Sequence, residues 1–298
     1  WRERVGTWAE RTQIVLFDEV YRVLAVAACR WTGVPIEKRG AERVARELSA
    51  MIENAGGLGP RMWHALLLRA WHERFVRNVI AQIRSGDLRL PPEAPARIVA
   101  EHRDPEGRWL DFATAAVELV NLLRPTAAIT RFIVFAAMAL ERHPEWRTAF
   151  AAGDETQLEG FVEEVRRLAP FFPAIGGRVR TPFDWRGRHF GKGEWVLLDL
   201  YGTNRDARSF ADPDRFGPER APSWREQSYR FVPQGGGDMH ETHRCPGERV
   251  TVELMKEAVR QLTRGMNYEV PPQNLAVSLA EMPARPASGF VIDKVRPG

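Results

Sequence analysis

The chain has 298 residues, 44% of them apolar, so it can bury a sizeable core as one large domain or two small ones. Its 43 basic and 39 acidic residues give a net charge of only +4, and their intermixing argues against nucleic-acid binding. No uninterrupted apolar run reaches the roughly 18 residues of a membrane span, and two distant cysteines without a secretory leader predict a cytoplasmic protein with no disulfide framework.

The first two thirds of the chain predict helices. Apolar residues at helical spacing in residues 17–35 predict a helix that stops at Gly33 and places Cys29 in the core as an ordinary small apolar residue. A second helix is expected over residues 60–85. Residues 110–144 are apolar almost all round, which predicts a long buried central helix.

The remainder changes in texture after a further helix over residues 155–170. Alternating patterns and glycines predict a small antiparallel sheet over residues 176–202, a helix over 246–266 and strands in 268–295. We therefore expect a mainly α fold with a minor antiparallel β portion. We expect a single domain over 1–298, with a helical part to about residue 170 and a mixed β and loop part over 171–298.

One of the two cysteines lies in the unusual segment FVPQGGGDMHETHRCPGERV, residues 231–250. A structural Cys245 would have no use for the three glycines or for the helix start that follows. A zinc site of His240, His243 and Cys245 matches none of the usual ligand spacings, and no fourth ligand is evident. A thiolate ligand to haem iron explains the segment, because glycines allow close approach to the macrocycle and a helix N-terminus stabilises the negative sulfur.

This segment resembles the cysteine-ligand loop of the cytochrome P450 superfamily. The residues that carry the resemblance are Phe231, Gly235, His243, Arg244, Cys245, Pro246 and Gly247. It implies haem b as cofactor and Cys245 as the axial iron ligand. It also implies cofactor contacts for four further residues: Phe231 near the sulfur and haem face, His243 at a propionate, and Gly235 and Gly247 in the loop. For Phe231 and His243, simple loop packing is the alternative.

Two further motifs match the superfamily in order and spacing. Glu164 and Arg167 resemble its E-x-x-R pair, with Glu163 and Arg166 as a competing register, and Arg220 resembles its downstream partner arginine. A carboxylate between two guanidinium groups forms a charge-assisted lock that can fix a loop beneath the haem. Each pair considered alone is also compatible with a surface salt bridge of little energetic value.

The central helix lacks the acid-alcohol pair of ordinary monooxygenases and carries Arg124-Pro125 there instead. A proline inside a helix removes a backbone hydrogen bond and should kink it, at about 3 kcal/mol when uncompensated. A buried arginine requires an anionic partner, for which Glu118 is one candidate. Together with the cysteine loop and VLLDLYGTN, residues 196–204, this pair resembles the fatty-acid peroxygenase branch of the superfamily.

That resemblance implies hydroxylation of long-chain fatty acids at the α or β carbon with hydrogen peroxide and no dedicated redox partner. Arg124 would hold the substrate carboxylate, which would serve as the acid-base group, and Pro125 would open space above the iron. Electron donation from Cys245 would favour cleavage of the O–O bond. Phe172, Ala174 and Ile175 could line the acyl channel, with ordinary apolar packing as the alternative.

Three other functions remain open at this stage. Decarboxylation to terminal alkenes could occur on the same site, a reductase-dependent monooxygenase would lack its proton-relay residues, and a non-catalytic haem-binding fragment is a further alternative. The sequence begins at Trp1 without an initiator methionine, and the resemblance lacks about the first quarter of the superfamily fold. We therefore expect an N-terminally incomplete fold.

Overall fold

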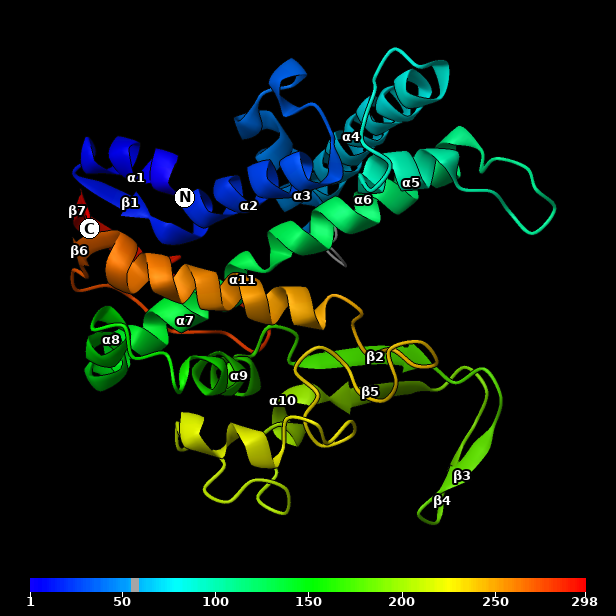
Figure 1. Cartoon of the computed structure of the whole chain (residues 1–298). Helices are drawn as coiled ribbons and strands as arrows, with labels where there is room; N and C mark the ends of the chain where they lie inside the picture. Colours follow the sequence, from blue (N-terminus) through cyan, green and yellow to red (C-terminus); the bar gives the residue numbers. More distant parts are fainter. Residues whose placement is uncertain (55–58) are drawn as a thin grey trace. The chain divides into compact units, whose positions relative to one another are not determined.

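A computed structural model describes residues 1–54 and 59–298, which form a mainly helical fold with small antiparallel sheets (Figure 1). This confirms the predicted fold class. The chain divides into two compact units. Unit 1 comprises residues 1–134, 264–273 and 288–298, and unit 2 comprises 135–263 and 274–287. The first boundary between the units falls between residues 134 and 135.

Unit 1 contains most of the helices and one three-stranded sheet. Its helices are α1 (Arg2–Ala9), α2 (Leu16–Thr32), a short 3-10 turn (Ile36–Lys38), α3 (Ala41–Glu53), α4 (Pro60–Ser85), α5 (Pro95–Glu101) and α6 (Phe112–Ala128). Its antiparallel sheet has the order β1 (Gln13–Val15), β7 (Val291–Pro297) and β6 (Met266–Glu269).

The ends of the two helices predicted in this unit have local causes. Helix α2 ends at Gly33, whose φ of +84° is left-handed and whose N–H donates to the carbonyl oxygen of Cys29 at 3.0 Å. Helix α4 has Pro60 in its first turn, and Gly86, with φ +84°, follows its last residue. Both predictions are confirmed, whereas α1, α3 and α5 were not predicted.

The central apolar segment forms α6 and α7 (Thr130–Arg142), separated at Ile129 and with Pro125 inside α6. Asp111 caps α6 because its carboxylate accepts the backbone N–H groups of Ala113 and Thr114. By length and composition the segment Phe112–Arg142 could cross a membrane, contrary to the sequence expectation, yet 78% of its most apolar window is buried in the structure. Burial of that kind is typical of a core helix.

Unit 2 contains most of the second half of the chain. Its helices are the end of α7, α8 (Pro144–Ala151), α9 (Leu158–Leu168), α10 (Leu200–Thr203), a 3-10 turn (Pro218–Ser223) and α11 (Glu248–Arg260), which continues as a short π-helical stretch, Gln261–Gly265. Strand β2 (Ala174–Arg178) pairs with β5 (Trp195–Asp199), and β3 (Phe183–Trp185) pairs with β4 (Arg188–Phe190), both antiparallel. These pairs confirm the predicted sheet.

The predicted strands of the tail form only at its two ends. Between β6 and β7, the described residues make a single isolated bridge, from Val277 to Pro286. Residues 270–290 contain four prolines, which lack the N–H donor that a strand ladder requires. The prediction of strands throughout residues 268–295 was therefore wrong for the middle of the segment.

Candidate functional site

Cys245 lies three residues before the first residue of α11, Glu248, and is a free, half-buried cysteine. Its backbone N–H donates to the carbonyl oxygen of Gln234 at 3.0 Å, and its carbonyl accepts the N–H of Glu248 at 3.2 Å. A β-carbon at Gly247 would lie 3.6 Å from its Sγ. The thiol-bearing residue is therefore fixed by its backbone at the positive end of a 13-residue helix.

The glycines before Cys245 are required by the path of the loop. Gly235 has φ +92°, and a β-carbon there would overlap the backbone carbonyl oxygen of His243. Gly237 has φ +91°, and a β-carbon there would overlap Oγ1 of Thr242. Only glycine meets both conditions, because it adopts left-handed backbone angles without strain and carries no side chain. The loop therefore folds back closely on itself just before Cys245.

Phe231 and His243 occupy different environments. Phe231 is 2% exposed and packs in an aromatic cluster in which its ring centroid lies 4.6 Å from that of Trp224. The guanidinium carbon of Arg166 lies 5.3 Å from the same ring. His243 is exposed. The packing of Phe231 in unit 2 thus has a structural explanation of its own.

Glu164, Arg167 and Arg220 come together in unit 2. Arg167 donates two hydrogen bonds to the carboxylate of Glu164, from Nε at 2.7 Å and from Nη2 at 2.8 Å. The same carboxylate accepts Nη2 of Arg220 at 3.1 Å and the backbone N–H of Gly217 at 3.0 Å. Both Glu164 and Arg167 are buried, so the bidentate pair is protected from solvent.

The contacts of Arg167 continue toward the cysteine loop. Its Nη1 donates to the carbonyl oxygens of Asn204 at 2.8 Å and Pro213 at 2.7 Å. The side-chain oxygen of Asn204 accepts the backbone N–H of Val232 at 2.8 Å. Helix α9 is therefore connected through Asn204 to the residue that follows Phe231.

The competing register also forms, but with different partners. Arg166, fully buried, pairs with Glu163 and with Glu248 in the first turn of α11. Glu248 also accepts Nε of Arg244 at 2.6 Å. Burial raises the pKa of Glu163 more than Arg166 lowers it, whereas for Glu248 burial is outweighed by Arg166 and Arg244, so the pKa of Glu248 is lowered. Sequence spacing alone offered no signal for the partnership with Glu248.

Arg124 belongs to unit 1 and is half-buried in α6, immediately before the exposed Pro125. Across residues 1–54 and 59–298 it makes no ion pair, and the alternative partner Glu118 is exposed. The fully buried arginine of this region is Arg131, which pairs with Glu53. The carboxylate of Glu53 therefore offsets the free-energy cost of burying the guanidinium group of Arg131.

Phe172, Ala174 and Ile175 belong to unit 2, at the start of the β2–β5 pair. Phe172 is 39% exposed and Ile175 is 45% exposed, while Ala174 is half-buried. In the pair, Ile175 lies opposite Leu198, which is also exposed. These strands therefore present an apolar surface and not a packed core.

Other possible sites carry less chemistry. No cluster of three metal-binding side chains occurs within the part of the chain that the structure describes, so the zinc alternative gains no support. Cys29 is buried, and burial raises the pKa of its thiol to about 12, as expected for an inert core cysteine.

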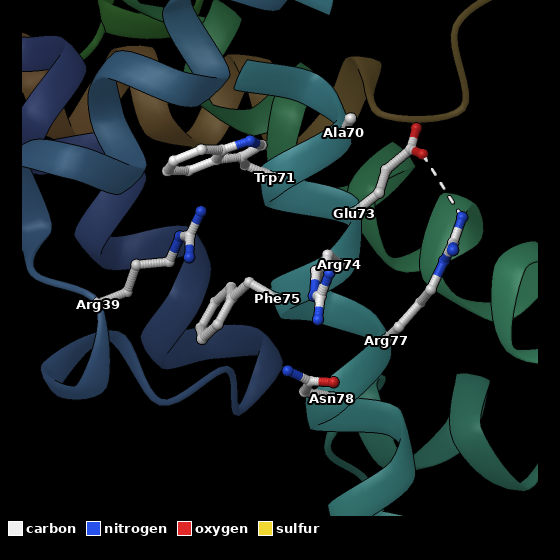
Figure 2. A pocket seen from close by; sticks show the side chains of 8 residues that line it. All are labelled: Arg39, Ala70, Trp71, Glu73, Arg74, Phe75, Arg77 and Asn78. Carbon is white, nitrogen blue, oxygen red and sulfur yellow. Dashed lines mark ion pairs between the residues drawn. The ribbon is translucent and has the colours of Figure 1, made fainter. Parts of the chain in front are cut away.

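A hollow of about 760 Å³ in unit 1 is formed along α4 and is lined by Arg39, Trp71, Phe75 and five other residues (Figure 2). Arg39 stacks on Phe75 at 5.0 Å and pairs with Glu47. None of the residues predicted to act in catalysis line this hollow.

Comparison with known proteins identifies the family. A profile of the cytochrome P450 family matches residues 156–279. Cytochrome P450 4A11 of Homo sapiens is 28% identical over 131 residues, which are 43% of this chain and 24% of the relative. Cytochrome P450 84A4 of Arabidopsis thaliana is 29% identical over 121 residues, 39% of this chain and 23% of the relative. These alignments span about a quarter of the curated relatives.

Solved structures match over the whole chain. Cytochrome P450SP alpha (CYP152B1) in complex with (R)-ibuprofen is 42% identical with a TM-score of 0.94, and the chain covers 73% of it. Cytochrome P450EX alpha (CYP152N1) with myristic acid is 36% identical with a TM-score of 0.88 and 74% coverage. A variant of cytochrome P450 OleT in complex with arachidonic acid is 31% identical with a TM-score of 0.92 and 71% coverage.

The chain belongs to the cytochrome P450 superfamily. Within it, the chain belongs to the same branch as the CYP152 proteins named above, the branch that the cysteine loop and Arg124-Pro125 predicted.

The residues around Cys245 fit a haem thiolate ligand. Cys245 is free, half-buried and at the start of α11, where the helix dipole stabilises a negative sulfur. The loop beside it is built from glycines whose positions leave no room for side chains. Within the described residues no disulfide or metal-binding cluster claims the thiol.

Proposed function

We propose that the chain is a haem-thiolate peroxygenase that hydroxylates long-chain fatty acids at the α or β carbon with hydrogen peroxide. Cys245 would ligate the iron of haem b, with Phe231, Gly235, His243 and Gly247 around the cofactor. When bound, a haem with a thiolate ligand supplies the oxidising chemistry, because the sulfur donates electron density that favours O–O cleavage. The observation that carries the proposal is the pair Arg124-Pro125 in the apolar helix α6.

Arg124 is the residue proposed to bind the substrate. It is half-buried and makes no ion pair within the described ranges, whereas the nearby Arg131 is paired with Glu53. A guanidinium group without a carboxylate partner suits a fatty-acid carboxylate, which it can bind with two parallel hydrogen bonds. The bound carboxylate would then move protons in place of the acid and alcohol side chains of ordinary monooxygenases.

The ligands of related structures support this substrate class. Ibuprofen, myristic acid and arachidonic acid, named with the three related structures, are all carboxylic acids with large apolar parts. Phe172, Ala174 and Ile175, on the exposed apolar start of the β2–β5 pair, are proposed to contact the acyl chain. Pro125, which cannot donate a backbone hydrogen bond, would help to open space beside Arg124.

Replacing Arg124 tests the proposal. We expect Arg124→Ala to lower peroxide-dependent turnover of a long-chain fatty acid by about 10²- to 10⁴-fold, because the acid-base group is no longer held in place. The thiolate spectrum of the haem-loaded protein should not change. Arg142→Ala, at the exposed end of α7, is the matched control and should retain full turnover.

Product analysis completes this experiment. Hydroxy acid is the expected product, and terminal alkene would instead indicate decarboxylation on the same site. Undiminished turnover by Arg124→Ala would contradict its role as the carboxylate anchor. Turnover that requires an electron-donating reductase, and does not occur with peroxide alone, would contradict the peroxygenase reaction.

A further inference from the structure

We infer that Gln234, held by Arg166, is a positioning residue that fixes Cys245 for iron ligation. The inference rests on the proposed function and deepens it, because it explains what holds Cys245, the proposed iron ligand, in place. It concerns residues of unit 2 only.

Gln234 contacts three parts of the unit around Cys245. Its backbone carbonyl oxygen accepts the N–H of Cys245 at 3.0 Å. Its side-chain Oε1 accepts Nε of Arg166, on α9, at 3.1 Å, and its Nε2 donates to Oγ1 of Thr251, on α11, at 3.2 Å. Thr251 in turn donates to the carbonyl oxygen of Gly247 at 3.1 Å. One side chain therefore connects two helices to the backbone partner of Cys245.

Arg166 can hold Gln234 because it is itself fixed. It is fully buried, and its three nitrogens contact three different acceptors: Nε reaches Gln234, Nη1 reaches Glu163 and Nη2 reaches Glu248. The planar guanidinium group offers these donors in a rigid arrangement that a lysine could not reproduce.

The charges of this network also lie next to the cysteine along the chain. Arg244 directly precedes Cys245, and its Nε donates to the carboxylate of Glu248 at 2.6 Å. Glu248 lies three residues after Cys245. Along the chain, Cys245 therefore lies between the two residues of an ion pair, and its backbone N–H donates to Gln234. Because hydrogen bonds and charge around a ligating sulfur tune its donation to iron, loosening this arrangement should alter ligation as well as stability.

The first test uses the haem-free protein. In Gln234→Met the side chain keeps its approximate size but loses its bonds to Arg166 and Thr251. We expect the Cys245 amide to exchange its hydrogen on the order of tenfold faster than in the wild type, as loss of two modest hydrogen bonds implies. Gln227→Met is the matched control, because among the described residues the side chain of Gln227 bonds only to Ser223 and Arg230. Its backbone carbonyl oxygen, which the substitution keeps, accepts the N–H of Phe231 at 3.0 Å.

The second test uses the haem-loaded protein. We expect Gln234→Met to lose a measurable part of the red-shifted Soret band that the reduced, carbon monoxide-bound form shows with a thiolate ligand. Gln227→Met should retain the wild-type band. A purely structural role for Gln234 would lower stability and leave the spectrum of the folded protein unchanged.

The two tests separate the inference from the proposed function. Wild-type exchange or a wild-type spectrum in Gln234→Met would overturn the positioning role. A wild-type protein without the red-shifted band would contradict haem-thiolate ligation, and the exchange rates would then decide whether Gln234 fixes the Cys245 backbone.

Discussion

At the scale of single residues, Gly235 shows why the segment before Cys245 is rich in glycine. Its φ of +92° and its close approach to the backbone of His243 exclude any side chain. The sequence predicted glycines beside a flat cofactor. The structure shows a second cause, which is the tight return of the loop on itself.

We expect Gly235→Ala to lower the free energy of unfolding by at least about 1–3 kcal/mol, because the new methyl group combines backbone strain with overlap of a carbonyl oxygen. Urea unfolding of the haem-free protein measures this change. Gly177→Ala, where the added carbon meets nothing within 4 Å, is the control and should change stability by less than about 0.5 kcal/mol. Equal stability of the two variants would contradict the steric explanation.

The arginines of the central helix show the limit of sequence reasoning at this scale. The sequence identified Arg124 as a cation that needs an anion and left Glu118 as an alternative partner. Arg131 lies seven residues further along, in α7, and is the arginine that is fully buried and paired with a protein carboxylate, Glu53. Residues 53 and 131 are too far apart in sequence for any local pattern to reveal their contact.

At the scale of elements, the Glu164–Arg167–Arg220 lock connects α9 to the loops around residues 204–220. Removing the charge of Glu164 leaves two buried or partly buried guanidinium groups without their carboxylate. We expect Glu164→Gln to lower the free energy of unfolding by about 3–5 kcal/mol, measured by urea titration. In contrast, Glu159→Gln breaks only partly exposed pairs and should cost less than about 1 kcal/mol. Similar losses in both variants would refute the buried lock.

A second buried carboxylate connects α3 and α4. Burial of Glu47 would raise its pKa, but hydrogen bonds from His72, Arg39 and Arg43 lower it from 4.5 to about 2. The carboxylate therefore stabilises the fold above pH 4.5, and this contribution is lost as the pH falls toward 2.

We expect the wild-type protein to lose about 2 kcal/mol of stability through Glu47 over this pH range, after allowance for screening. Glu47→Gln should lack that part of the pH dependence while remaining less stable at neutral pH. Denaturant unfolding at several pH values measures both. An unchanged pH profile in the variant would show that Glu47 does not titrate below its ordinary pKa.

The sequence predicted the positions of helices best where proline or glycine marks their ends. Helix α4 runs over residues 60–85 as expected, because proline and glycine mark its ends. The predicted central helix stops at residue 144, and Pro144 also begins α8, since proline fits the first turn of a helix. The two overlapping E-x-x-R registers could not be ranked by spacing, because each glutamate and arginine finds its further partners on distant segments.

At the scale of the whole molecule, the chain covers 71–74% of the related structures described above, while its parts form two compact units. The motifs identified the superfamily because the cysteine loop and the E-x-x-R helix both lie in unit 2 and keep their order along the chain. The residues proposed for substrate carboxylate binding lie in unit 1.

The most direct measurement of the central claim is the Soret spectrum of the haem-loaded, reduced protein under carbon monoxide. Wild-type protein and Cys29→Ala, which alters a buried core cysteine, should both show the red-shifted band of a thiolate ligand, whereas Cys245→Ala should lack it. Absence of the band from the wild type, or its persistence in Cys245→Ala, would contradict ligation of the iron by Cys245.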